Sequence, residues 1–216
     1  MPSSPIIRID MSEPGHFHEP VKKAAAVLGR GGVVAFPTES FYGLGVDASN
    51  EAALSRLFTV KGRDRGRPLL VLVPHGEMVD RYAQEVPGVA RVLMETFWPG
   101  GLTLVFRAGP HVSPLLTAQT GRIGIRYSSH PLAAALTKTL GKALTGTSAN
   151  LSGQPACSSA EAVVEAFGGA IDLVLDGGHT AGEIGSTVLD VTGDPPRILR
   201  QGMVTRRQLE AVIAVR

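Results

Sequence analysis

Glycine and proline most constrain how this chain can fold, because they interrupt it at short intervals along its length. The sequence of 216 residues contains 26 glycines and 15 prolines, and they follow no repeating period. Both residue types disfavour the interiors of helices and strands, so the elements between them must be short. Many short elements need many turns, and turns are places where ligands can bind.

The length and composition predict a single domain with a substantial core. Hydrophobic residues make up 44% of the chain and charged residues 19%, which excludes a disordered or low-complexity protein. A chain of this length usually forms one compact domain, so we expect one over residues 1–216. The formal net charge of +2 is too small to coat nucleic acid by charge alone, so any basic site must be local.

No segment predicts a membrane span or a secretory signal. The apolar run at 69–73 stops at Pro74, far short of the roughly 18 residues that a membrane helix needs. The first ten residues lack a basic patch followed by an apolar block. The single cysteine, Cys157, excludes a disulfide framework, and we expect it to be a core residue. These features predict a cytoplasmic protein that has no membrane contact.

Hydrophobic periodicity predicts helices and strands along the chain. They alternate in places, and elsewhere one strand follows another with no helix between them. Helical patterns cover about 20–30, 50–58, 77–82, 89–97 and 131–140, and capping-box spacings at Ser158 and Thr205 precede two more helices. Strands are expected over 33–36, 69–73, 102–106, 123–126, 144–147, 171–175, 187–191 and 197–200. We place Gly43 and Gly45 in a loop. The pattern predicts an α/β or α+β domain with a mixed sheet.

The common nucleotide and metal motifs are absent. Gly141 and Lys142 are followed by Ala143, so there is no P-loop, and the glycines from Gly43 lie too far from the preceding strand for a dinucleotide fingerprint. The six histidines include one close pair, His16 and His18. A dedicated metal site is therefore not expected.

A basic segment stands out just before the apolar run at 69–73. Lys61, Arg63, Arg65 and Arg67 occupy every second position, and in an extended segment alternate side chains share one face. Converging cations fit a polyphosphate or an RNA backbone, with Lys61 as an exposed cation. The alternative is a solvated loop whose cations point into water.

Two other polar features have two interpretations each. The loop at 147–153 carries three hydroxyls and an amide, which suit either a small polar ligand or an ordinary turn. Arg126 ends an apolar strand, where a guanidinium can hold a carboxylate in a cleft or lie on the surface. Spacing alone leaves these alternatives open.

Taken together, the motifs occur in a recognisable order. They are Pro37-Thr38-Glu39-Ser40, Lys61-x-Arg63, Trp98-Pro99-Gly100, Ile125-Arg126, Thr147-Ser148-Ala149-Asn150, Gly185-Ser186-Thr187 and Leu199-Arg200-x-Gly202. This order resembles the YrdC-like family, whose characterised members are threonylcarbamoyl-AMP synthases. The resemblance spans about 21–202 and implies a twisted mixed parallel and antiparallel sheet flanked by helices around a basic cavity. We expect a C-terminal helix over 203–216 and the short form of the family, without an extra C-terminal domain.

The resemblance implies an enzyme, a nucleotidyltransferase that joins L-threonine, bicarbonate and ATP into threonylcarbamoyl-AMP and releases pyrophosphate. Its product would go to a downstream threonylcarbamoyl transferase for the modification of tRNA adenosine, and direct contact with tRNA stays open. Mg²⁺ is expected to arrive bound to ATP. The alternatives are a paralogue with another carbamoyl-adenylate activity and an RNA-binding module that uses the same basic concavity.

The resemblance also assigns site residues, without naming a catalytic base. The threonine pocket would contain Thr38, Arg126, Ser148 and Ser186. ATP would contact Lys61, Arg63, Arg65, Asn150, Ser158 and Arg200. Leu72 stands where longer relatives often carry histidine and Asp64 where proline is common, so a threonine contact near Leu72 stays open.

Overall fold

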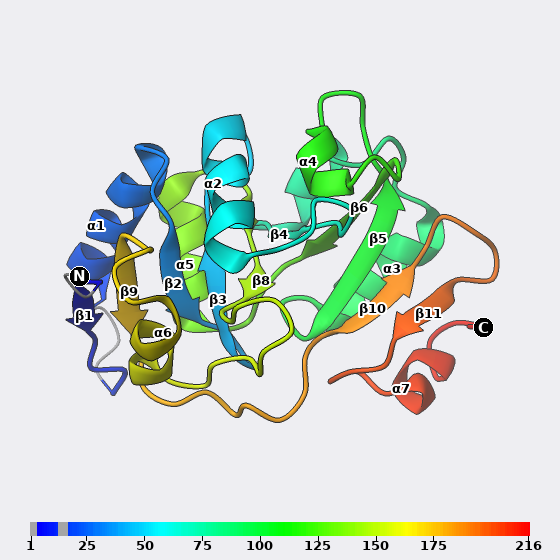
Figure 1. Ribbon diagram of the computed structural model, residues 1–216. Coiled ribbons are helices and arrows are strands. Elements are labelled where there is room, and N and C mark those ends of the chain that lie inside the picture. Colours follow the sequence, from blue (N-terminus) through cyan, green and yellow to red (C-terminus); the bar gives the residue numbers. More distant parts are fainter. Residues whose placement is uncertain (1–3, 13–16) are drawn as a thin grey trace.

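Two mixed β-sheets and the helices around them make up the computed structural model, which describes residues 4–12 and 17–216 (Figure 1). The strands are β1 (Ile6–Arg8), β2 (Val34–Pro37), β3 (Tyr42–Gly45), β4 (Leu70–Leu72), β5 (Leu102–Arg107), β6 (Arg122–Arg126), β7 (Leu144–Thr145), β8 (Thr147–Ser148), β9 (Leu173–Asp176), β10 (Thr187–Asp190) and β11 (Arg197–Arg200). The helices are α1 (His18–Gly29), α2 (Glu51–Lys61), the 3₁₀ helix η1 (Gly76–Arg81), α3 (Gly88–Phe97), α4 (Pro114–Thr117), α5 (Pro131–Leu140), α6 (Ala160–Phe167) and α7 (Arg206–Glu210). The expected mixed α/β fold is confirmed.

The first sheet has the strand order β1-β9-β2-β3-β8. Its parallel pairs are β1 with β9 and β9 with β2, whereas β2 pairs antiparallel with β3 and β3 with β8. One apolar cluster joins this sheet to α1 and α5 through Val21, Leu28, Phe36, Leu132 and Leu136. Val21 and Leu28 on α1 and Leu132 and Leu136 on α5 recur at helical spacing, which is why the two helices cover the sheet.

The second sheet has the order β11-β10-β5-β6-β4-β7, with β5 and β6 antiparallel at its centre and β4 parallel to β6. The two sheets approach each other where β3 ends and β7 begins. Val46 and Thr145 exchange hydrogen bonds there, and Asp47 forms an isolated bridge with Leu144. The site described below lies between the sheets, so this junction sets the relative position of its two walls.

Several local predictions are confirmed at the residues that carry them. Asn50 caps α2 by accepting from the Ala53 amide at 3.0 Å, and Thr205 forms a capping box with Gln208. The apolar run at 69–73 contains the buried strand β4, and Cys157 is a buried core residue. In the described part of the chain, no helix is long and apolar enough to cross a membrane.

Other local predictions were wrong in position or type. Tyr42–Gly45, expected as a loop, is strand β3, and the expected strand at 144–147 is divided at Gly146 into β7 and β8. Ser159, rather than Ser158, caps α6 by accepting from the Ala162 amide. The final helix spans Arg206–Glu210 and is therefore shorter than the expected 203–216.

Gly202, just after β11, packs closely against the backbone at Gly185 and Ser186. A Cβ atom there would lie 2.3 Å from the Gly185 carbonyl oxygen and 2.6 Å from that of Ser186, and backbone cannot move away cheaply. We therefore expect Gly202→Ala to lower the free energy of unfolding by about 1–3 kcal/mol. Urea denaturation measures it.

Gly88→Ala is the matched control, because Gly88 lies in the first turn of α3 with nothing within 4 Å of the added atom. That change should leave stability unaltered or raise it by about 0.4–1 kcal/mol. Equal stability of the two variants would contradict the packing argument.

Candidate active site

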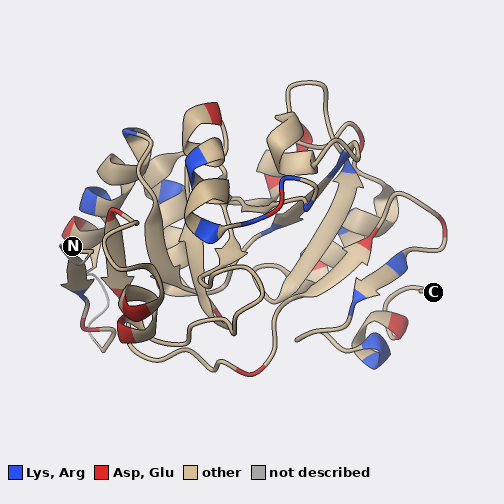
Figure 2. Cartoon of the chain, in the orientation of Figure 1, with Lys and Arg blue, Asp and Glu red and all other residues tan. Residues whose placement is uncertain are grey.

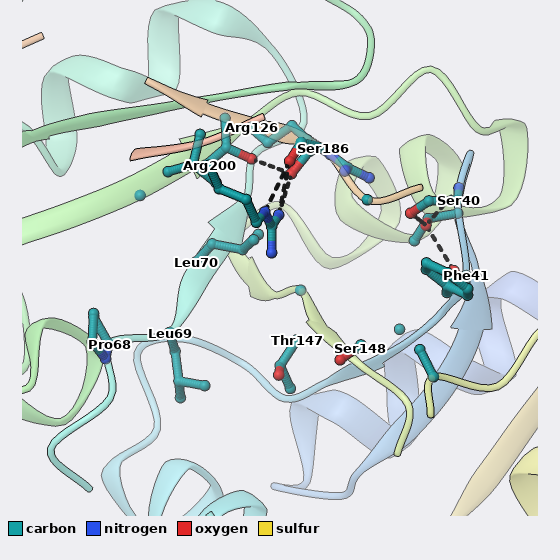
Figure 3. Close-up of a pocket in the computed structure, with 18 of the residues that line it drawn as sticks. Ser40, Phe41, Pro68, Leu69, Leu70, Arg126, Thr147, Ser148, Ser186 and Arg200 are labelled. Carbon is teal, nitrogen blue, oxygen red and sulfur yellow. Dashed lines mark hydrogen bonds between the residues drawn. The ribbon is translucent and has the colours of Figure 1, made fainter. Parts of the chain in front are cut away.

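A cavity of about 880 Å³ lies against one face of the second sheet (Figure 3). Alternate residues of a strand point to the same side, and β6 presents Arg122, Gly124 and Arg126 to the cavity. Gly124 leaves the floor bare between the two arginines. The opposite wall includes Thr38 and Ser40, from the turn between β2 and β3.

Four arginines and one carboxylate are the charged residues among the described lining. They are Arg63, Arg122, Arg126, Arg200 and Glu183. Hydroxyl and apolar groups make up much of the remaining surface. The hydroxyls include those of Thr103 on β5 and of Ser186, which directly precedes β10. A cavity with this lining suits a ligand that is anionic at more than one point.

Arg126 is held by Glu39 across the gap between the sheets. Its Nη2 donates to Glu39 Oε2 at 2.6 Å, and the two side chains are 5% and 10% exposed. Glu39 also accepts from the backbone amide and the hydroxyl of Ser129. Burial alone would raise the pKa of the Glu39 carboxyl, but Arg126 and these hydrogen bonds hold that pKa below its usual value. The pair is therefore ionised at neutral pH.

The burial of Arg126 excludes the interpretation of this residue as a surface arginine. Burial lowers the pKa of the Arg126 guanidinium. The Glu39 carboxylate opposes this decrease, whereas the nearby positive charge of Arg200 lowers the pKa further. Its Nε is the one buried side-chain polar atom of the described residues that has no hydrogen-bond partner. Arg126 thus has hydrogen-bonding capacity that the protein itself does not use.

Ser186 links Arg200 to the floor of the cavity. Its hydroxyl lies 2.8 Å from Thr103 Oγ1, and Arg200 Nη2 donates to the Ser186 carbonyl at 2.8 Å and to its hydroxyl at 3.2 Å (Figure 3). Neither Arg200 nor Arg63 has a carboxylate partner among the described residues, so both keep an uncompensated positive charge in the cavity.

Lys61 is not the exposed cation that the sequence predicted, because its side chain is fully buried at the C-terminal end of α2. Its ammonium donates to the Ser148 carbonyl, to the Asn150 carbonyl at 2.8 Å and to Asn150 Oδ1 at 3.4 Å. Burial and the nearby Arg63 guanidinium lower the pKa of Lys61 to about 8. In this structure Lys61 fastens the loop after β8 and does not line the cavity.

The basic segment is not extended, because it starts in the last turn of α2 and continues into a loop (Figure 2). Its cations are therefore not in the alternating arrangement that would place them on one face. Gly62 ends α2 in the left-handed conformation, with φ of 57°, and a turn follows at 64–67. Arg63 is half-buried, lines the cavity and donates to the Pro68 carbonyl at 2.9 Å. Arg65 and Arg67 are exposed outside the cavity lining, as in the solvated-loop interpretation.

The structure brings the four predicted threonine residues to the cavity: Thr38, Arg126, Ser148 and Ser186 all line it. Of the predicted ATP residues, Arg63 and Arg200 line it, whereas Lys61, Arg65, Asn150 and Ser158 do not. Asn150 Oδ1 accepts from the Ser148 hydroxyl at 2.6 Å and so orients a lining residue. The Ser158 carbonyl accepts from the Thr180 amide, which joins it to the loop after β9.

Sequence reasoning gave no role to Glu39 or Arg122. Glu39 stands beside Thr38 in the motif, but nothing in the spacing indicates that it pairs with an arginine 87 residues away. Arg122 lies two residues from Gly124 and four from Arg126 on β6, and this alternation was a usable signal for a third cavity position.

Metal ligands are not gathered in the described residues, where no group of three histidine, cysteine or acidic side chains could hold an ion. Of the histidine pair, His16 lies outside the described residues and His18 is exposed near Glu19. The carboxylates at or beside the cavity lining are Glu183, Glu39, which is paired with Arg126, and Asp190, which is paired with Arg122. The donor set does not fit a protein-held metal.

Comparison with known proteins places this cavity in a wider context. The profile of the Sua5, YciO and YrdC family, described as telomere recombination, matches residues 26–202. A threonylcarbamoyl-AMP synthase from Bacillus subtilis (strain 168) is 40% identical over 95% of this chain and 60% of its own length. The structure of Pyrococcus abyssi Sua5 complexed with L-threonine has a TM-score of 0.91 at 34% identity, over 98% of this chain and 62% of that one. Escherichia coli YciO has a TM-score of 0.78 at 27% identity, over 94% and 97%. The chain thus spans less than two thirds of the length of the first two relatives.

The Glu39–Arg126 pair predicts how stability depends on pH. The pKa of Glu39 is lower in the folded protein than the value of about 4.3 in an unfolded chain, so the unfolded state binds more protons in acid. The stabilisation is complete above the unfolded value and is lost as the pH falls through the folded value. At pH 7, Glu39→Gln should lower the free energy of unfolding by about 3 kcal/mol.

The same difference should shrink when wild type and Glu39→Gln are compared by urea denaturation at pH 3. Asp80→Asn is the control, because Asp80 pairs with Arg91 in an exposed ion pair, at 58% and 57% exposure. That variant should change stability by less than about 1 kcal/mol. A Glu39→Gln deficit that stays constant with pH would show that the carboxylate charge is not the cause.

Proposed function

Because this chain belongs to the Sua5/YciO/YrdC family, we propose that it is a threonylcarbamoyl-AMP synthase. The observation that carries the proposal is one cavity that holds a buried, carboxylate-oriented arginine, Arg126, together with two uncompensated arginines, Arg63 and Arg200. The first suits the carboxylate of an amino acid and the others suit phosphates. The names of the relatives point to the same pair of ligands.

The proposed reaction consumes L-threonine, bicarbonate and ATP. The threonine amine attacks carbon dioxide derived from bicarbonate and forms a carbamate, and the proton lost by the amine leaves with the hydroxide of bicarbonate as water. A carbamate oxygen then attacks the α-phosphorus in line, the bond from that phosphorus to the bridging oxygen breaks, and pyrophosphate leaves. Positioning and charge neutralisation are the main tasks of the protein in such a transfer.

At the amino-acid end, Arg126 would take the threonine carboxylate, with Thr38, Ser148 and Ser186 as hydroxyl partners. Thr38 Oγ1 already donates to the Phe41 carbonyl at 2.7 Å, so the turn fixes its orientation before a ligand binds. Ser186 is likewise fixed by Thr103 and Arg200. A pocket organised in advance reduces the ordering cost of binding.

At the nucleotide end, Arg63 and Arg200 would face the phosphates. Lys61 would act chiefly through the loop it fastens, because its ammonium already has three oxygen acceptors. Contacts from Arg65, Asn150 and Ser158 to ATP stay predictions. Since the donor set does not fit a protein-held metal, Mg²⁺ would enter with ATP.

The product is an activated carbamoyl group, so its consumer would be a transferase that delivers this group to tRNA adenosine. Direct RNA binding by this chain is the second candidate function, supported by the exposed Arg65 and Arg67. RNA binding would weaken steeply with salt and need no ATP. Adenylate formation needs all three substrates.

The proposed nucleophile predicts the substrate requirement. Pyrophosphate release should need threonine and bicarbonate together with ATP, because neither alone forms the carbamate. The assay measures pyrophosphate after each substrate is omitted in turn, with other amino acids replacing threonine as controls. Robust release with ATP alone would rule out this chemistry.

Arg126→Lys tests the amino-acid end. Lysine keeps the charge but cannot reproduce a planar fork, so one charged hydrogen bond to the carboxylate is lost. Such a bond contributes about 1.5–3 kcal/mol, which corresponds to a rise of roughly 10 to 150-fold in the apparent constant for threonine. The constant for ATP should change little. If the variant were defective toward ATP but normal toward threonine, Arg126 would belong to the nucleotide end of the cavity and the assignment would be wrong.

A further inference from the structure

We propose that His130 is a positioning residue for Arg126, although it lies outside the described cavity lining. By capping α5, His130 fixes the turn at 128–130, and that turn holds the Glu39 carboxylate to which Arg126 donates. Sequence reasoning gave His130 no role. The consequence for threonine rests on the proposed function, because it assumes that Arg126 takes the threonine carboxylate.

The turn lies where the chain crosses from the second sheet to the helices of the first. Arg126 ends β6, and residues 127–130 lead directly to α5, whose N-cap residue is His130. Leu132, in the first turn of α5, is fully buried in the apolar cluster that covers the first sheet. A change in how α5 begins would therefore move the turn relative to Glu39.

His130 begins α5 with its side chain, whereas Ser, Thr, Asp and Asn are the common caps. Its Nδ1 accepts from the Leu132 amide at 3.3 Å, and Pro131 between them has no amide that would need a partner. A ring nitrogen that accepts carries no proton, so the imidazole is neutral with its proton on Nε2. Burial lowers the pKa of His130, the Glu39 carboxylate opposes this decrease, and the Arg126 guanidinium adds to it.

The turn supplies three hydrogen bonds to Glu39. The Ser129 amide and the Ser129 hydroxyl, the latter at 3.0 Å, both donate to Oε1, and a hydrogen bond from the Ser128 hydroxyl also lowers the pKa of the carboxyl. Oε2 accepts from the Arg126 guanidinium. Because Ser129 holds one oxygen of the carboxylate, the turn sets the direction in which the other oxygen faces Arg126.

His130 is connected to these bonds through its own backbone. Its amide donates to Ser128 Oγ at 3.2 Å, and Ser128 is only 2% exposed. A hydroxyl oxygen that accepts from an amide keeps its own hydrogen free to donate, here to Glu39. The cap thus fixes the His130 backbone, that backbone orients Ser128, and Ser128 and Ser129 hold Glu39. The N-terminal end of α5 also favours a nearby carboxylate, because its amides leave a partial positive charge there.

The test compares caps in the full chain. His130→Ala removes the acceptor and should raise the apparent constant for threonine roughly 3 to 10-fold, the factor for one lost hydrogen bond, with kcat and the constant for ATP little changed. His130→Asn should restore the wild-type value, because asparagine is a good N-cap acceptor. Asn50→Ala is the matched control: it removes the cap of α2 beside Gly31, outside the cavity lining, and should lower stability without a threonine effect.

A second readout needs no ligand. The pKa of the Glu39 carboxyl, followed by carbon NMR of labelled glutamate, should rise toward its ordinary value in His130→Ala and stay low in His130→Asn and Asn50→Ala, because the turn supplies hydrogen bonds that lower it. Thermal unfolding of each variant shows whether it folds. Ser128→Ala leaves the cap intact and should raise the same pKa, so it decides the question if His130→Ala does not fold.

The proposal is overturned if Asn50→Ala raises the threonine constant as much as His130→Ala, or if the Glu39 pKa stays low in His130→Ala and Ser128→Ala. It is also overturned if His130→Asn fails to restore both values, since the hydrogen-bond acceptor would then not be the cause. The NMR readout separates this inference from the proposed function. A wild-type chain that makes no adenylate but shows the dependence of Glu39 on His130 would reject the function and retain the inference.

Discussion

The ion pair between Glu39 and Arg126 is the interaction on which the cavity depends. Glu39 lies on the turn between two strands of the first sheet, and Arg126 ends a central strand of the second. Hydrogen bonds at the junction also join the sheets, among them those of Val46 with Thr145 and of Ala48 with Ala143. A buried pair left with one partner is costly, so the two walls are held in one arrangement. The same contact fixes the orientation of the Arg126 guanidinium at the cavity.

Lys61 shows a related use of charge. Its buried ammonium gathers oxygens from Ser148 and Asn150, and its own carbonyl accepts from the Ser152 amide at 2.9 Å. The end of α2 and the loop after β8 are thereby joined twice. Within the Lys61-x-Arg63 motif, Lys61 therefore shapes the site, while Arg63 lines the cavity.

Local patterns predicted local structure well, and failed where distant partners decide the outcome. The uninterrupted apolar run gave β4 and the Asn50 side chain gave the start of α2, because burial and capping act within a few residues. β3 was missed because its glycines resemble a turn, although β2 and β8 supply its hydrogen bonds. The prediction that the cations share one face failed for a local reason, because Gly62 ends the helix in the left-handed conformation. The pairing of Arg126 with Glu39 lies beyond any spacing rule.

Gly124 has a consequence for how this site can change over generations. An added Cβ there would lie 3.3 Å from Thr103 Cγ2 and 3.4 Å from Leu70 Cβ, so a methyl group needs only a small adjustment of its neighbours. The same methyl group would lie on the cavity floor between two arginines, where it would compete with a ligand for space. A substitution at Gly124 would therefore affect ligand binding far more than the stability of the fold. This makes Gly124 a position at which the substrate range of the domain could change while the fold is kept.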